Sequence, residues 1–356
     1  MKLNFNGGLY GREALCYQGR GIVKQLGKEH KINIIGPKTQ GYWAKFYGNF
    51  KGREDVYVMN GHVPYLKELA KKHDKIVSIA VLECDFPTEW IDAINLSQVK
   101  QIWAISNFVK DMLKDQVNKP VKTIYLGLDK RLSKTDINIF PKDKSFKFLN
   151  VSAPHCIGKR DRKGLDVLIG AFKKEFGDDP TVKLILKINT IYADKLYKRY
   201  GTQFNLNNYL RTLLPKGMNT SNIQIITNYL SIEGLNSLYN SVDCGVFPHR
   251  SEGFGLSQAE MIKIGKPVIT TDYSATNEFS DPSLRIKVKG MWPLDYQNLP
   301  PYFKKRFAEP DEEHLRKLMR STYENRDYKF KLPAIFKELT WNSVGKKINS
   351  YVKEIK

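Results

Sequence analysis

The chain alternates short apolar runs with longer stretches whose apolar residues recur at the spacing of an amphipathic helix. The runs are rich in β-branched residues, as buried strands are. The predicted strands occupy residues 32–36, 75–82, 101–106, 121–127, 146–152, 182–188, 223–227, 244–248 and 266–271. Continuously apolar strands separated by helices are typical of parallel sheets that helices cover on both faces, so we expect an α/β fold.

The length of the chain and one polar segment predict two domains. A chain of 356 residues exceeds the usual size of a single core, and the segment 134–145 is polar and interrupted by Pro141. Apolar residues recur at helical spacing near the end of the chain, where we expect a helix that crosses back to the first domain. The predicted boundaries are 1–135 for a first Rossmann-like domain, 136–145 for a linker, 146–335 for a second Rossmann-like domain and 336–356 for the C-terminal helix.

Composition limits the compartment and the partners. The cysteines Cys16, Cys84, Cys156 and Cys244 are too far apart for a metal or redox motif, so we expect reduced packing residues. The chain has no apolar run of the roughly 20 residues that span a bilayer, and we expect a cytoplasmic protein. Its formal net charge of +21 should attract anions such as nucleotide phosphates, lipid head groups or nucleic acid. Contact with an anionic membrane surface is therefore left open.

Loops at the carboxyl ends of the strands are the candidate binding elements, because ligands of doubly wound sheets bind there. Gly7 and Gly8 follow the first short strand and would let a ligand approach the backbone closely. A helix is expected to start near Leu165, and a helix N-terminus with basic neighbours is an anion site, although an ordinary solvated turn fits equally well. The basic residues just before that helix are Lys159, Arg160, Arg162 and Lys163.

The segment Ser251–Glu260, with the sequence SEGFGLSQAE, combines two carboxylates with two glycines. Ser257 and Glu260 fit a capping box that would start a helix ending at Gly265. A cap does not explain Glu252 or the glycines beside it. Glycines at these positions would let backbone N–H groups approach a polar ligand.

The stretch HRSEGFGLSQAEMIKIGKPVITT resembles the Glu-x7-Glu signature of retaining glycosyltransferases with the GT-B fold, in the family 4 grouping. The stretches VLECDFPTEWI, IWAISNFVKDML, PVKTIYLGLD, RKGLDVLIGAFKKEF and LTWNSVGKKINSYV occur in the matching order, so the resemblance covers nearly the whole chain from Gly7 onward. It implies an α/β GT-B fold, in which two Rossmann-like domains face a central cleft and the second domain holds most of the donor.

The resemblance implies a hexosyltransferase that moves a sugar from a UDP- or GDP-linked donor to a saccharide, lipid-linked or protein acceptor, with retention. Glu252, Lys163 and His62 correspond to the catalytic positions, with Lys163 on the diphosphate and His62 in the first domain. The donor-binding positions are Gly8, Arg160, Arg162, Lys163, Gly253, Phe254, Gly255, Leu256, Ser257 and Glu260. Glu260 would accept from the ribose hydroxyls. The family arginine that accompanies the lysine is missing from its usual place, so Lys159, Arg160 or Arg162 would replace it.

No cofactor or metal is expected, because the nucleotide sugar is a substrate and the chain lacks an Asp-x-Asp motif. Retention is expected to come from front-face attack assisted by the leaving phosphate, with double displacement through Glu252 as the alternative. The competing functions are a non-catalytic nucleotide-sugar-binding protein, a sugar-nucleotide epimerase and a DNA-modifying glucosyltransferase. The glutamate pair with Lys163 favours transfer, and nucleic acid ranks second as an acceptor because no arginine-rich tail is present.

Overall fold

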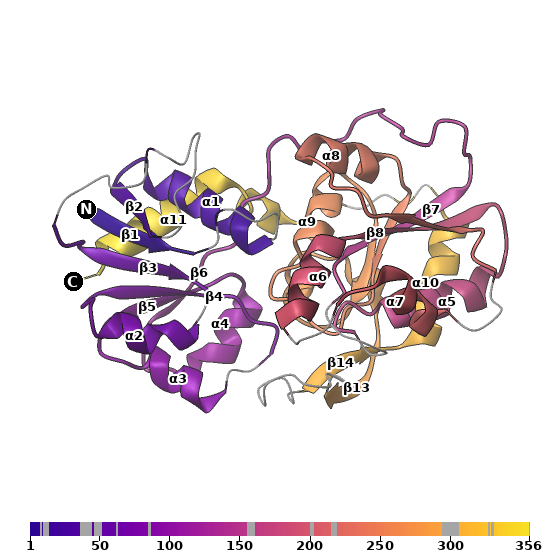
Figure 1. The fold of residues 1–356 in the computed structure, drawn as a ribbon. Helices are drawn as coiled ribbons and strands as arrows, with labels where there is room; N and C mark the ends of the chain where they lie inside the picture. The colour runs from indigo at the N-terminus through magenta and orange to yellow at the C-terminus, as the bar shows by residue number, and fades with distance from the viewer. Residues whose placement is uncertain are drawn as a thin grey trace. The chain divides into compact units, whose positions relative to one another are not determined.

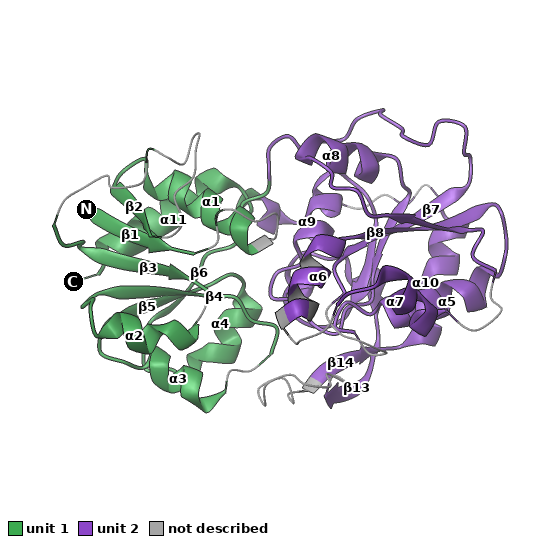
Figure 2. Ribbon diagram, viewed as in Figure 1, with its two compact units in different colours: residues 1–128, 337–356 green, residues 129–336 purple. Residues whose placement is uncertain are grey.

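The computed structural model divides into two compact units, residues 1–128 with 337–356 and residues 129–336 (Figure 2). Both units are parallel sheets with helices, so the predicted α/β class with two Rossmann-like domains is confirmed. No helix among the described residues is long and apolar enough to cross a membrane. The structure describes residues 1–7, 9, 14–35, 45, 52–61, 63–84, 87–154, 161–199, 203–214, 219–293, 306–326, 328 and 331–355.

The first unit is built on a six-stranded parallel sheet in the order β2-β1-β3-β4-β5-β6 (Figure 1). Central strands such as β3 are buried on both faces, with α1 and α11 on one face and α2, α3 and α4 on the other. The strands are β1 (Lys2–Asn6), β2 (Lys31–Ile35), β3 (Val56–Asn60), β4 (Ile76–Ala80), β5 (Val99–Ala104) and β6 (Val121–Thr123). The helices are α1 (Ala14–Leu26), α2 (Leu66–Ala70), α3 (Thr88–Ile94), α4 (Asn107–Lys114) and α11 (Trp341–Lys353).

The C-terminal helix α11 packs against α1, so the last residues of the chain belong to the first unit. The indole N–H of Trp341 donates to the Tyr17 hydroxyl at 3.1 Å. Gly21 of α1 lies under the same indole, and a Cβ at Gly21 would stand 1.9 Å from the Trp341 ring. The close approach of the two helices therefore requires glycine at this position.

The second unit has a six-stranded parallel sheet in the order β12-β11-β10-β7-β8-β9 and a separate antiparallel pair, β13 and β14. One face of the sheet packs on α5, α7 and α10 around an aliphatic and aromatic core. The strands are β7 (Phe146–Ser152), β8 (Val182–Ile188), β9 (Ile223–Ile226), β10 (Cys244–Phe247), β11 (Val268–Thr271), β12 (Arg285–Ile286), β13 (Val288–Pro293) and β14 (Arg306–Pro310). The helices are α5 (Leu165–Phe176), α6 (Thr190–Arg199), α7 (Leu206–Leu213), α8 (Ile232–Asn240), α9 (Leu256–Lys263) and α10 (Glu312–Glu324).

The segment 136–145, expected as a linker, is part of the second unit. The backbone N–H of Ile139 donates to the Ser241 hydroxyl at 2.8 Å, just after α8. The preceding Thr135 N–H donates to the Asn240 side chain at 2.9 Å. These bonds tie the segment to the end of α8.

The strand order of the second unit places a topological switch point between β7 and β10. From β7, the strands β8 and β9 are added toward one edge of the sheet, and β10, β11 and β12 are added toward the other edge. This is the Rossmann strand order. The loops that follow β7 and β10 lead into α5 and α9. Ligands of such sheets bind between the two loops at the switch point.

Candidate active site

The loop before α5 brings its basic residues against the loop after β10. Helix α5 starts at Leu165, as predicted, and its N-cap is Gly164 at a left-handed φ of 69°. A Cβ at Gly164 would lie 1.8 Å from the Pro248 carbonyl oxygen. Only glycine allows this approach, which sets Lys163 beside the segment that carries Glu252.

Two basic side chains share the Glu252 carboxylate. The Lys163 Nζ donates to Glu252 Oε1 at 2.6 Å, and the Arg162 Nη1 lies 3.4 Å from Oε2. Arg162 also donates to the Ser251 carbonyl oxygen at 2.8 Å. Glu252 and Arg162 are buried, so the attraction is screened less than at the surface. The cluster holds two positive charges and one negative charge, and a further anion would balance it.

The charge of Glu252 is fixed by its neighbours. Burial acts to raise the pKa of Glu252, but attraction to Lys163 and Arg162 outweighs it and holds this pKa well below its usual range. The carboxylate is therefore ionised at neutral pH and a weak base. Burial lowers the pKa of the nearby His249 to about 4, so the imidazole is neutral. Its Nε2 lies 2.9 Å from the Thr270 hydroxyl oxygen.

Helix α9 begins two residues earlier than a cap at Ser257 would allow, so the predicted capping box is wrong. The helix runs from Leu256, and its N-cap is Gly255 at a φ of 89°, with no side-chain cap. Left-handed backbone at Gly255 starts the helix and places Ser257 inside the first turn. The uncapped first turn therefore points backbone N–H groups and a positive potential outward.

Glu260 is buried in the second turn of α9 and faces α8. Its carboxylate accepts a hydrogen bond from the Tyr239 hydroxyl at 2.8 Å. Burial raises the pKa of Glu260 to about 7, against the opposing effect of that bond. The helix ends at Lys263, two residues before the predicted Gly265, whose φ is 86° and whose N–H donates to the Ile262 carbonyl at 3.0 Å.

Four of the buried polar atoms without a partner in the described part of the chain lie at one edge of the second sheet. They are at or just after the carboxyl ends of β7, β10 and β11, while others, such as Ser145 Oγ and Asn277 Oδ1, lie elsewhere in the same unit. Buried polar groups are nearly always hydrogen-bonded, so such a concentration is typical of a site for a polar ligand. The atoms are Ser152 Oγ, His249 Nδ1, Ser251 Oγ and Thr271 Oγ1.

The structure brings together the main residues expected at the donor site. Lys163, Arg162 and Glu252 are in contact, whereas Glu260 lies in the second turn of α9. The residues between them, Gly253, Phe254, Gly255, Leu256 and Ser257, form the β10–α9 loop and the first turn of α9. The expected residues Gly8, His62, Lys159 and Arg160 lie outside the described residues. No cluster of three or more His, Cys, Asp or Glu side chains in the described ranges could hold a metal ion.

Sequence reasoning missed Arg250, which is buried two residues before Glu252. Its guanidinium contacts Asp166 and Glu309, which lie 84 and 59 residues away in the chain. The sequence shows only that Arg250 is a basic residue within HRSE. The motif resemblance assigns no role to this position. Contacts of this range are set by the sheet order and by β14.

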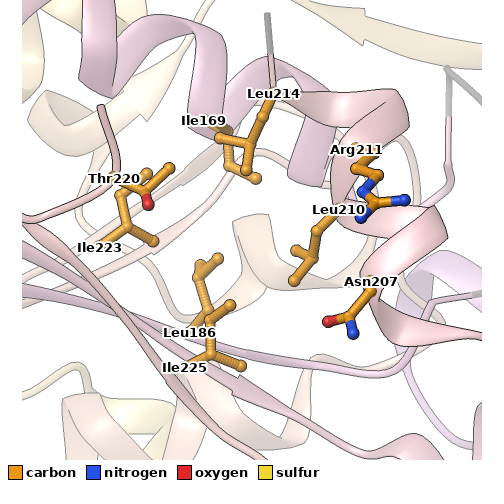
Figure 3. A pocket seen from close by; sticks show the side chains of 9 residues that line it. All are labelled: Ile169, Leu186, Asn207, Leu210, Arg211, Leu214, Thr220, Ile223 and Ile225. Carbon is orange, nitrogen blue, oxygen red and sulfur yellow. The ribbon is translucent and has the colours of Figure 1, made fainter. Parts of the chain in front are cut away.

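A hollow of about 270 Å³ between α7 and β9 lies apart from this charge cluster (Figure 3). None of the residues around Glu252 lines it. Its walls are aliphatic, and Asn207 and Arg211 of α7 supply polar groups. The hollow is lined by Ile169, Leu186, Asn207, Leu210, Arg211, Leu214, Thr220, Ile223 and Ile225.

Several solved structures have a similar fold. HepE from Anabaena, solved in complex with UDP and glucose, is 14% identical with a TM-score of 0.61, and the match covers 99% of this chain and 100% of that chain. Sucrose-phosphate synthase from Thermosynechococcus elongatus is 11% identical with a TM-score of 0.67, covering 99% and 98%. A UDP-forming trehalose-phosphate synthase from Burkholderia xenovorans is 11% identical with a TM-score of 0.58, covering 99% of each. At these identities the likeness shows the fold, which is the two-domain GT-B fold.

The family comparison concerns the second unit. Residues 155–288, which include Lys163, Glu252 and Glu260, match the family described as glycosyl transferases group 1. A search of curated protein sequences gives no match.

Proposed function

We propose that the chain is a retaining glycosyltransferase that moves a hexose from a UDP- or GDP-linked donor to a saccharide, lipid-linked or protein acceptor. The observation that carries this proposal is the contact between Lys163 and Glu252, where the N-termini of α5 and α9 meet the switch point of the sheet. A cation and two helix N-termini suit a diphosphate. A buried, ionised carboxylate suits sugar hydroxyls. The UDP and glucose named with HepE support the same donor class.

The chemistry requires a negatively charged leaving group to be stabilised. As the bond from the anomeric carbon to the phosphate oxygen breaks, charge builds on the departing nucleoside diphosphate. Lys163 and Arg162 are already held at the site by Glu252 and Ser251, so they need little reorganisation. Removing one such donor typically costs about a hundredfold to a thousandfold in rate.

Front-face attack fits the state of Glu252 better than double displacement does. Both carboxylate oxygens face cations, and these cations lower the pKa of Glu252, so it is a weak nucleophile. In our proposal the acceptor hydroxyl attacks the anomeric carbon on the face from which the diphosphate leaves. The hydroxyl proton passes to the leaving phosphate oxygen. Glu252 then accepts hydrogen bonds from the sugar hydroxyls and does not form a covalent bond.

The proposal is tested with the purified chain and a panel of labelled UDP- and GDP-sugars, with saccharide, lipid-linked and protein acceptors. We expect one donor to be consumed with retention, and we expect Lys163→Ala and Glu252→Gln to reduce turnover at least roughly a hundredfold. Lys174→Ala is the matched control. Lys174 lies in α5, away from the site, and its Nζ forms an ion pair with the Glu312 carboxylate at 2.6 Å. Binding of a donor without transfer would indicate a sensor, and failure to bind any donor would refute the proposal.

A further inference from the structure

Arg250 is a buried cation whose hydrogen-bonding capacity is fully used. Its side chain is 1% exposed. The Nη1 and Nη2 atoms donate to the two oxygens of Asp166, both at 2.9 Å, and Nε and Nη2 donate to Glu309 at 3.0 and 2.8 Å. The remaining Nη1 proton goes to the Asp161 carbonyl oxygen at 2.5 Å. All five N–H groups of the guanidinium therefore have an acceptor.

Two of these acceptors lie beside the charge cluster. Asp161 lies in the loop that carries Lys163, and Asp166 is in the first turn of α5. The Arg250 backbone adds two bonds, because its N–H donates to the Arg162 carbonyl at 2.7 Å and its carbonyl accepts from Ala308 of β14 at 3.0 Å. One residue thus joins both loops of the switch point, the start of α5 and the β13–β14 pair.

A lysine could not make the same set of contacts. An ammonium group has three donors and no planar fork, so it cannot make the five hydrogen bonds by which Arg250 holds two carboxylates in a bidentate manner and one carbonyl. The side chains of Asp166 and Glu309 are 16% and 23% exposed, and both depend on Arg250 for these charge-assisted bonds. Loss of the hydrogen bonds from the Arg250 guanidinium to Asp166 would free the start of α5 from the loop after β10.

We propose that Arg250 is a positioning residue that sets the distance between Lys163 and Glu252 and thereby the grip of the site on a nucleoside diphosphate. The inference rests on the proposed function for the identity of that ligand. It adds that the ion pair between Arg250 and Glu309 holds the β13–β14 pair against the loop before α5 and the loop after β10.

The first test compares UDP with uridine, which lacks the phosphates. We expect Arg250→Lys to weaken UDP binding roughly tenfold or more and to leave uridine binding nearly unchanged. A misplacement of about 1 Å can cost a hundredfold in catalytic rate, and the same displacement of Lys163 would weaken its contact with the phosphates. Arg285→Lys is the control. Arg285 lies in the same unit and donates to the Asn277 and Ser280 carbonyl oxygens, which belong to neither the loop before α5 nor the loop after β10. Equal losses for UDP and uridine, or unchanged UDP binding, would overturn the inference.

A double-mutant cycle asks whether Arg250 acts through Lys163. In a Lys163→Met background, Arg250→Lys should weaken UDP binding little further, whereas fully additive losses would contradict the positioning role. If Arg250→Lys does not fold, Glu309→Gln removes only one arm of the fork and should change UDP binding in the same direction by a smaller factor. An unchanged UDP affinity in a folded Glu309→Gln variant would contradict the proposed fastening of β14.

A ligand-free measurement separates this inference from the proposed function. Urea unfolding of Lys163→Met, Glu252→Gln and their double variant gives the coupling between the two side chains. We expect that coupling to be smaller in the Arg250→Lys background, and an unchanged coupling would refute the positioning role. Failure of the unaltered chain to bind either UDP or GDP would refute the proposed function and leave this arm of the test valid.

Discussion

Replacing Gly164 with alanine should force apart the two loops that hold Lys163 and Glu252. The added Cβ would stand 1.8 Å from the Pro248 carbonyl oxygen, and because real Cβ contacts stay above 3.0 Å the backbones must separate by about 1.2 Å. The left-handed φ of 69° adds strain of about 1 to 2 kcal/mol for any side chain. Together with overpacking of about 1 to 3 kcal/mol, the free energy of unfolding should fall by roughly 2 to 5 kcal/mol.

The functional effect should exceed what the lost stability explains. A displacement of about 1 Å between a cation and its target can cost about a hundredfold in rate, so UDP binding and donor turnover should fall sharply in Gly164→Ala. Gly265→Ala is the matched control, because Gly265 has a similar φ of 86° but no atom within 4 Å of its added Cβ. That variant should lose only the strain of about 1 to 2 kcal/mol and keep its UDP affinity.

Urea denaturation and isothermal titration with UDP on the two variants provide the measurement. The reasoning fails if Gly164→Ala binds UDP as tightly as Gly265→Ala does, or if the two variants lose equal stability. Either result would mean that the contact between Gly164 and Pro248 relaxes without moving the site.

Four other outcomes are expected. Glu260 ionises in the folded protein near pH 7, so UDP affinity should rise between pH 6 and 8 if the carboxylate binds ribose, and titration should find this rise absent in Glu260→Gln. Because folding raises the pKa of Glu260 from 4.5, its contribution to the free energy of unfolding is fully present below pH 4.5 and is lost as the pH rises through 7. Urea denaturation of the protein and of Glu260→Gln across this pH range measures that contribution. Glu252→Gln should remove about 3 to 5 kcal/mol from the free energy of unfolding, while UDP binds more tightly because its phosphates replace the missing counter-charge. Trp341→Ala should cost about 2 kcal/mol or more by leaving Gly21 uncovered, with UDP affinity unchanged by titration.

The sequence predicted the elements better than the contacts between them. Runs such as Val182–Ile188 are strands in the structure because their apolar pattern leaves little choice of state. The capping box at Ser257 failed because local spacing does not reveal that Gly255 adopts a left-handed backbone. The β13–β14 pair was not predicted, since β13 is half-buried or exposed along its whole length and its pairing with β14 is interrupted by a register shift near Gly290.

The candidate site divides in the same way. Motif resemblance located Lys163 and Glu252, which are 89 residues apart, but their contact depends on the backbone approach at Gly164. The Arg250 network was beyond prediction, because its partners come from α5 and β14 and are joined only when the sheet is assembled. Burial and hydrogen bonding decide such a network, and neither can be read from spacing along one segment.

The packing of α11 on α1 also dictates the order in which the chain can mature on the ribosome. Residues 129–336 form an uninterrupted unit that can complete its core as soon as it emerges, whereas the first unit must wait for residues 337–356. At about 5 to 20 residues per second, the roughly 320 residues between Gly21 and Trp341 leave the surface around Gly21 uncovered for roughly 16 to 64 s of synthesis. Nascent chains stalled at increasing lengths should therefore gain protease resistance in the second unit before the first. The earliest part of the chain to be made is the last to be finished, and during that interval it is the part in most need of a chaperone.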